Sequence, residues 1–228
     1  MKEPLIRVRN VSFRYDSRPV LKDINFEVYE GDRIGLIGPN GSGKTTLLHI
    51  IMGLLKPEEG TLEILGKVRE KEKDFLEVRQ KIGLLFQNSD NQLFCPLVKE
   101  DVAFGPLNLG VPKREVDGIV DETLSMLGIS YLKNRISARL SEGEKRLVAL
   151  ATIIAMKPIC YMLDEPSAGL DEFYTEKVLR FLTENAKTYV VVSHDRTLIE
   201  TVSNKVFVLR EGVLLPQNLS VRKTTRLY

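Results

Sequence analysis

The most informative segment of this chain is a short glycine-rich loop, which reads Gly38-Pro39-Asn40-Gly41-Ser42-Gly43-Lys44-Thr45. It fits the pattern GxxxxGK[ST], whose glycines permit backbone angles that aim several N–H groups at a phosphate. The apolar run before it, residues 33–38, predicts a strand, and residues 44–54 have helical character until Pro57 interrupts them. A strand, a glycine-rich loop and a helix in this order predict a nucleotide site rather than a plain turn.

The end of the loop carries the phosphate and metal chemistry. Lys44 is expected to reach the β- and γ-phosphates, and Thr45 offers a hydroxyl to Mg²⁺, which prefers oxygen ligands. Thr46 follows directly, and we assign it to the same nucleotide site. The expected cofactors are therefore ATP and Mg²⁺, and replacement of Lys44 should cripple ATP binding or turnover.

Composition restricts the class of protein. The chain has 228 residues, 43% hydrophobic and 28% charged, which is typical of a globular protein with one large or two small domains. Thirty-three basic residues nearly balance 31 acidic ones, so a net charge of +2 gives no reason to expect nucleic acid as a partner. Cys95 and Cys160 lack metal-ligand spacing. We expect neither a signal peptide nor a membrane span, since the longest apolar run, 147–156, is about half the required length.

The apolar pattern predicts an α/β fold. Alternation over residues 6–15 and 24–29 predicts half-buried strands, and residues 88–140 turn helical, with breaks expected at Pro96, Pro106 and Pro112. The last third alternates helices with apolar strands, which predicts a buried parallel sheet. Further expected strands are 61–65, 82–86, 159–163, 189–193 and 206–209, and expected helices are 115–127, 142–156, 172–185 and 197–202.

Two adjacent carboxylates, Asp164 and Glu165, end the buried-type strand 159–163. In a phosphate-loop enzyme the first would hold Mg²⁺, and the second would orient or deprotonate the attacking water. The plainer alternative is a solvated acidic turn before Pro166. Guanine specificity is disfavoured, because the nearest match to an NKxD segment, residues 204–207, lacks the aspartate.

With these motifs the chain resembles the ATP-binding cassette (ABC) ATPases over nearly its whole length. Leu140-Ser141-Glu142-Gly143-Glu144 is similar to the LSGGQ signature of that family, and residues 167–171 resemble its SALD-type loop. Gln87 falls at the glutamine loop and His194 at the switch histidine, although each taken singly could be an ordinary surface amide or a buried histidine. The resemblance implies that Glu165, His194 and Gln87 are catalytic, and that Thr45, Gln87 and Asp164 hold the metal.

The resemblance also implies a single nucleotide-binding domain of three parts: an antiparallel N-terminal sheet, a parallel phosphate-loop core and a helical insert. The expected boundaries are a catalytic core of residues 1–87 and 141–215, a helical subdomain of 88–140 and a short tail of 216–228. Tyr15 occupies the place of the aromatic that stacks on adenine, with Phe13 as its competitor and core packing as the alternative for either. His49 has no role in the family and is expected to pack.

The signature departs from the family pattern, because Glu142 replaces a glycine and Glu144 replaces the usual glutamine. A carboxylate that points inward would repel ATP, whereas one that points outward would be harmless. Ser141 and Gly143 match the motif and remain the expected phosphate contacts. We therefore predict that the signature still works.

The segment after Gln87 resembles the ATPases of energy-coupling factor importers, which take up vitamins or metal ions such as cobalt and nickel. The residues that carry this resemblance are Asn88, Asp90, Asn91, Gln92, Leu93, Phe94, Pro96, residues 100–106 and Asn108. It implies three partners: a second ATPase subunit, the same or different, packed head to tail; a transmembrane scaffold; and a substrate-binding membrane subunit. It also implies a peripheral place on the cytoplasmic face of the membrane. A subunit of another ABC transporter and a soluble ABC ATPase remain the alternatives, and the short basic tail departs from the C-terminal extension of many relatives.

Overall fold

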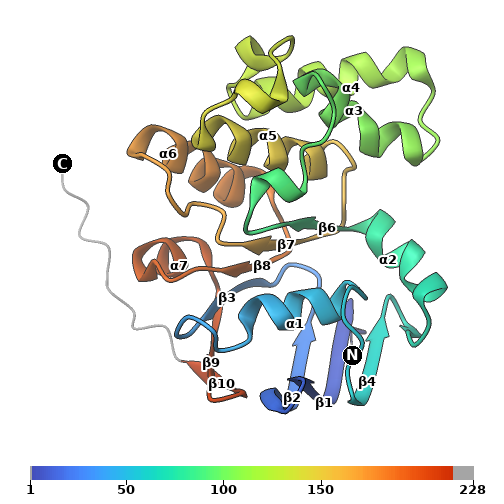
Figure 1. Ribbon diagram of the computed structural model, residues 1–228, viewed down its shortest axis with the longest axis vertical. Helices are drawn as coiled ribbons and strands as arrows, with labels where there is room; N and C mark the ends of the chain where they lie inside the picture. Colours follow the sequence, from blue (N-terminus) through green and yellow to red (C-terminus); the bar gives the residue numbers. More distant parts are fainter. Residues whose placement is uncertain (1, 218–228) are drawn as a thin grey trace.

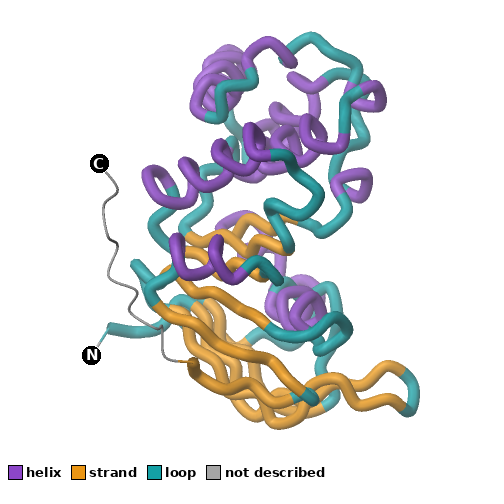
Figure 2. The backbone as a smooth tube through the Cα atoms, turned by 90° about the vertical axis from the view of Figure 1, so that its left-hand side faces the viewer, coloured by secondary structure: helices purple, strands orange, loops and turns teal. Residues whose placement is uncertain are grey.

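Two sheets and a group of helices make up the computed structural model, which describes residues 2–217 (Figure 1). Seen from the side, the strands gather in one half of the molecule and most of the helices in the other (Figure 2). The α/β class predicted from the sequence is confirmed. Within residues 2–217, no helix is both long and apolar enough to cross a membrane.

The N-terminal sheet has four strands in the order β2-β1-β4-β5, all paired antiparallel. Strand β1 (Ile6–Tyr15) alternates buried and exposed side chains along most of its length, which is the pattern of a sheet with one face on a core. The other three strands are β2 (Arg18–Val28), β4 (Glu59–Ile64) and β5 (Lys67–Val68). The buried face joins a hydrophobic cluster that also includes helix α1.

The second sheet has six strands in the order β10-β9-β3-β8-β7-β6. All neighbours are parallel except β9 and β10, which pair antiparallel. The strands are β3 (Arg33–Ile37), β6 (Ile82–Leu85), β7 (Cys160–Asp164), β8 (Tyr189–Val192), β9 (Lys205–Arg210) and β10 (Val213–Gln217). Every residue of β6, β7 and β8 is buried, which explains why these strands are apolar apart from Asp164 at the end of β7.

Helix α1 (Lys44–Ile51) follows β3, and α5 packs against α3 and α4 to form the helical region (Figure 1). The remaining helices are α2 (Phe75–Lys81), α3 (Val98–Asn108), α4 (Lys113–Met126), α5 (Glu142–Ile154), α6 (Glu172–Arg180) and α7 (Arg196–Val202). Short turns of 3₁₀-helix lie at Glu72–Asp74, Ser89–Asn91, Ser130–Leu132 and Ser137–Arg139.

One local prediction was wrong, and one strand was missed. Pro106 lies inside α3 instead of ending it: its missing N–H removes only one helical hydrogen bond, and α3 continues to Asn108. The helix predicted over 172–185 is confirmed in its bounds, as α6 with a final π-helical turn, Phe181–Asn185. Strand β10 was not expected at all, and it extends into the tail predicted from residue 216; the rest of that tail, 218–228, lies outside the described residues.

Candidate functional site

The strand order explains how distant parts of the sequence meet at one sheet edge. Strands β3, β8, β7 and β6 are consecutive and parallel, so the segments after their carboxyl ends lie at the same edge. These segments hold the glycine-rich loop after β3, His194 after β8, Asp164 and Glu165 at the end of β7, and Gln87 after β6. An α/β sheet binds ligands at this edge.

The glycine-rich loop adopts backbone angles that only glycine tolerates well. Gly38 has a φ of 152° and a Cβ on it would lie 2.2 Å from the carbonyl oxygen of Leu209, and Gly43, at a φ of 103°, caps the start of α1. Within this loop, the ammonium of Lys44 donates hydrogen bonds to the carbonyls of Gly38 (2.9 Å) and Pro39 (3.0 Å). Burial lowers the pKa of Lys44. The loop is thus folded around its own cation.

A cavity of about 310 Å³ opens beside this loop. Its lining residues are Tyr15, Arg18, Val20, Gly41, Ser42, Gly43, Lys44, Thr45 and Thr46. Tyr15 is 49% exposed, whereas Phe13 is buried in the core and supports the Tyr15 ring edge-on at 4.9 Å. Of the two aromatic candidates, therefore, only Tyr15 faces the cavity. Arg18 was not singled out from the sequence, since an exposed arginine at the start of a strand, here β2, gives no signal.

The residues expected to hold the metal lie together. The Thr45 hydroxyl donates a 2.6 Å hydrogen bond to Asp164 Oδ2, while Asp164 Oδ1 and the Ser42 hydroxyl are buried without a hydrogen-bond partner in residues 2–217. Burial raises the pKa of Asp164, against the hydrogen bond from Thr45. Buried polar atoms are normally paired, so an unpaired carboxylate oxygen beside a hydroxyl fits a site for a cation with oxygen ligands.

Glu165 is held in an unusual conformation next to His194. Its φ of 50° lies in the left-handed region that residues other than glycine rarely adopt, and its side chain is largely buried. One carboxylate oxygen lies 2.9 Å from Nδ1 of His194, whose own side chain is 66% exposed. The imidazole therefore bridges the buried acid and solvent, a position suited to a group that holds a general base.

Gln87 follows β6 with an exposed side chain, and its backbone is bound from another element. Arg146 on α5 donates hydrogen bonds to the carbonyls of Phe86 (2.7 Å) and Gln87 (2.5 Å). Sequence reasoning missed Arg146. A signal was present, because this cation begins the otherwise apolar face of α5 that includes the buried Ala149 and Leu150. His49 packs its ring against Phe86, as expected.

Glu142 and Glu144, the two acidic residues at which the signature segment departs from the family pattern, each have a local partner. Ser141 caps α5: its hydroxyl accepts a hydrogen bond from the Glu144 N–H (3.2 Å), and the Glu144 carboxylate accepts one from the Ser141 N–H (2.9 Å). The Glu142 carboxylate lies 3.2 Å from the Lys145 ammonium, which also pairs with Asp90 at 2.8 Å. Glu144 therefore serves as a cap and Glu142 is paired with a cation, so the structure gives each added charge a local role.

Gly143, in the signature segment, lies close to an aromatic ring. A Cβ on Gly143 would lie 2.6 Å from the ring of Tyr174, which explains the glycine.

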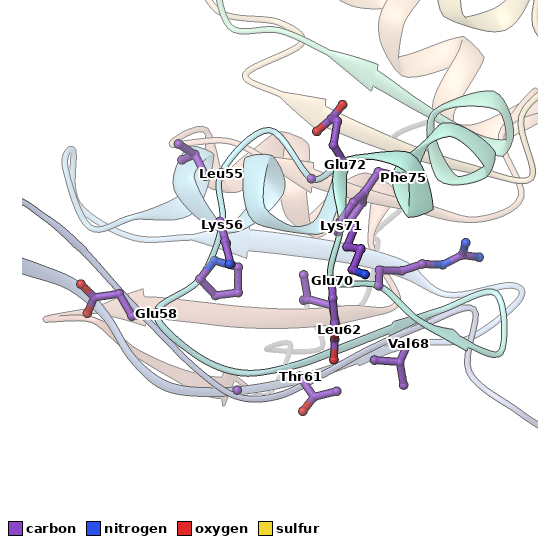
Figure 3. A pocket seen from close by; sticks show the side chains of 14 residues that line it. Leu55, Lys56, Glu58, Thr61, Leu62, Val68, Glu70, Lys71, Glu72 and Phe75 are labelled. Atoms are coloured by element: carbon purple, nitrogen blue, oxygen red, sulfur yellow. The ribbon is translucent and has the colours of Figure 1, made fainter.

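A larger cavity, of about 550 Å³, lies away from these residues, between the end of α1, β4 and the start of α2 (Figure 3). None of the site residues named above lines it, so cavity volume is a poor guide to this site.

Known proteins resemble this chain along nearly its whole length. The family model described as ABC transporter matches residues 21–168. An energy-coupling factor transporter ATP-binding protein, EcfA of Methanothermobacter thermautotrophicus, is 44% identical over 218 residues, which cover 93% of this chain and 70% of that protein. The solved structure of cbiO1 from Clostridium perfringens, described as part of the ABC transporter complex cbiONQ, is 33% identical with a TM-score of 0.84, covering 96% of this chain and 89% of that one. A dimeric bacterial ABC transporter cassette is 28% identical with a TM-score of 0.85, at 94% and 98% coverage.

Proposed function

Since the chain belongs to the ABC transporter family and is an ATPase, we propose that it is the ATP-hydrolysing subunit of an importer of the energy-coupling factor type. The observation that carries the catalytic part is the contiguous arrangement on β7 and its neighbours. Thr45 lies against Asp164, and Glu165 lies against His194, at one sheet edge. We further propose that the substrate is a vitamin or a transition-metal ion such as cobalt or nickel.

In the proposed mechanism, each residue of the site has a defined role in ATP binding or hydrolysis. Lys44 and the backbone N–H groups of the loop bind the β- and γ-phosphates, while Thr45, Asp164 and Gln87 would hold Mg²⁺, which supplies charge neutralisation of the phosphates. Glu165 accepts a proton from the attacking water, and His194 keeps the Glu165 carboxylate in place. Tyr15 stacks on the adenine ring, beside a cavity that the loop already shapes.

We propose that two chains complete each site. The cavity of one chain is lined by the phosphate loop and by Tyr15, but by no residue of the signature segment. In a head-to-tail pair, Ser141 and Gly143 of the second chain would contact the γ-phosphate from the N-terminus of α5. The resemblance to a dimeric cassette supports this arrangement. ATP then favours the closed pair by its differential affinity for that state.

The proposed contact with a membrane subunit lies after the glutamine loop. Phe94 is 65% and Phe104 48% exposed, and their rings meet edge-on at 4.7 Å. The buried carboxylate of Asp101 fixes the Phe94 loop, because it accepts hydrogen bonds from the N–H groups of Phe94 (3.0 Å) and Cys95 (2.9 Å) and from the hydroxyl of Ser137 (2.6 Å). A rigid, exposed aromatic pair is a suitable anchor for a partner helix. We propose accordingly that the chain lies peripherally on the cytoplasmic face of a membrane.

The test is affinity capture of tagged Glu165→Gln protein with MgATP from detergent-solubilised native membranes. A multi-span scaffold together with a substrate-binding membrane protein is expected, and the latter identifies the substrate. Adding Phe94→Ser and Phe104→Ser should release the membrane proteins while ATP binding persists. Leu76→Ser, an equally exposed apolar residue on α2, is the matched control. Recovery of soluble partners alone would reject the importer in favour of a soluble ABC ATPase.

A further inference from the structure

The backbone around Gln87 is linked to one helix, α5, by hydrogen bonds. Arg146 binds the carbonyls of Phe86 and Gln87, on both sides of the Gln87 α-carbon. The third backbone group of this segment, the N–H of Phe86, donates to the side-chain oxygen of Gln92 at 3.2 Å. The amide nitrogen of Gln92 in turn donates to the carbonyl of Ala149 and to the hydroxyl of Thr152, each at 2.8 Å. The glutamine loop is thus fastened to α5 at several points.

Arg146 is an unusual choice for a purely structural role. The residue is 6% exposed, yet it has no acidic side chain within ion-pair distance among residues 2–217. Burial lowers its pKa, while the negative charges of Asp164, Glu142 and Glu165 oppose that shift. Burying a cation that is bonded only to carbonyls lowers the stability of the folded protein. Its planar fork, however, holds the two carbonyl oxygens in one rigid geometry, whereas the ammonium of a lysine rotates about its last bond.

The same helix begins at the signature. Ser141 caps α5, and Arg146 lies one and a half turns further along it, so a shift of the helix N-terminus moves both together. We infer that Arg146 is a positioning residue that sets the place of the Gln87 side chain and makes it follow the orientation of the signature helix. The inference rests on the proposed role of Gln87 in catalysis. It assigns to Arg146 no contact with nucleotide.

The experiment is a double-mutant cycle on steady-state ATP hydrolysis with Arg146→Gln, Gln87→Ala and the combination. Arg146→Gln should lower kcat by about 10- to 100-fold and change the KM for MgATP by less than about threefold, because the phosphate loop is untouched. Arg146→Lys, which can still reach one carbonyl, should recover part of the loss. In the Gln87→Ala background, Arg146→Gln should cost less than about threefold, since the residue it positions is gone.

Arg69 provides a matched control. It is equally buried and donates to the backbone carbonyls of Ile64 and Asp74, and unlike Arg146 it also pairs with the carboxylate of Glu77 at 2.9 Å. It lines the larger cavity and not the candidate site. Arg69→Gln should lower the unfolding temperature and leave kcat within about twofold in the folded protein. Multiplicative losses in the double mutant, or an unchanged kcat in Arg146→Gln, would overturn the inference and leave the importer proposal intact. An unchanged kcat in Gln87→Ala would remove the role of Gln87 itself, and the inference with it.

Discussion

Asp164 is a buried acid whose charge should destabilise the protein in the absence of metal. It is 2% exposed, one of its oxygens is unpaired, and burial raises its pKa. Asparagine has the same shape and can still accept the hydrogen bond of Thr45, but it carries no charge. Removing the buried charge should gain about 1–3 kcal/mol, less about 0.5–1 kcal/mol for the weaker hydrogen bond. Asp164→Asn should therefore stabilise the nucleotide-free protein at pH 8, while its MgATP hydrolysis falls at least about 100-fold.

The pH dependence follows from the direction of the pKa shift. A carboxyl whose folded pKa is raised binds its proton at a higher pH in the folded state than in the unfolded chain, so stability is lost as pH rises through the folded pKa. The advantage of Asp164→Asn should then be largest at pH 8 and shrink toward pH 4, close to the unfolded pKa of about 3.9. Urea unfolding followed by circular dichroism in EDTA measures both. A net gain of about 0.5–2 kcal/mol corresponds to roughly 1–8 °C in unfolding temperature.

Asp101 is the matched control, because it is equally buried but both of its oxygens have partners. Asp101→Asn should destabilise the protein by about 1–3 kcal/mol at pH 8, since hydrogen bonds to a charged acceptor are lost. The two substitutions are chemically identical and should have opposite signs. If Asp164→Asn proved as destabilising as Asp101→Asn at pH 8, the argument from the unpaired oxygen would be refuted.

Three further outcomes are expected. Gly38→Ala should cost about 2–4 kcal/mol in chemical unfolding, because the new Cβ meets the Leu209 carbonyl at 2.2 Å; a cost under about 0.5 kcal/mol would contradict the observed loop geometry. Glu142→Gly should change the ATPase rate by less than tenfold, since Lys145 already pairs with the carboxylate; a gain of tenfold or more would show a compromised signature. Glu165→Gln should abolish turnover, keep MgATP binding and shift the protein to a dimer in size-exclusion chromatography with MgATP; an active variant would exclude Glu165 as the base.

The sequence predicted which loops gather at one edge of the sheet better than it predicted the ends of the helices and strands. Apolar strands that feed into polar residues were recognisable at Gly38, Asp164 and His194, because a parallel sheet gathers the residues that follow its strands. Strand β10 escaped because its residues are largely exposed and include Pro216, a poor sequence signal for a strand. It forms because β9 offers a free edge to pair with.

What the sequence could not show is which polar groups meet across long separations. Arg146 reaches Gln87, and Lys145 reaches Asp90, over more than fifty positions of sequence. For the same reason, the sequence alone could not show whether Glu142 and Glu144 would repel a phosphate. Their partners become visible only when α5 is formed, with Ser141 as its cap.

The position of the Lys44 ammonium should influence which anions the loop binds. Its ammonium has already left water and lost its rotamer freedom, held by the carbonyls of Gly38 and Pro39, before any ligand arrives. An incoming anion must outcompete two backbone dipoles at close range. A weakly charged anion gains little by that exchange, whereas a polyphosphate gains a full charge–charge attraction. We therefore expect the folded loop to bind highly charged ligands in preference to simple anions.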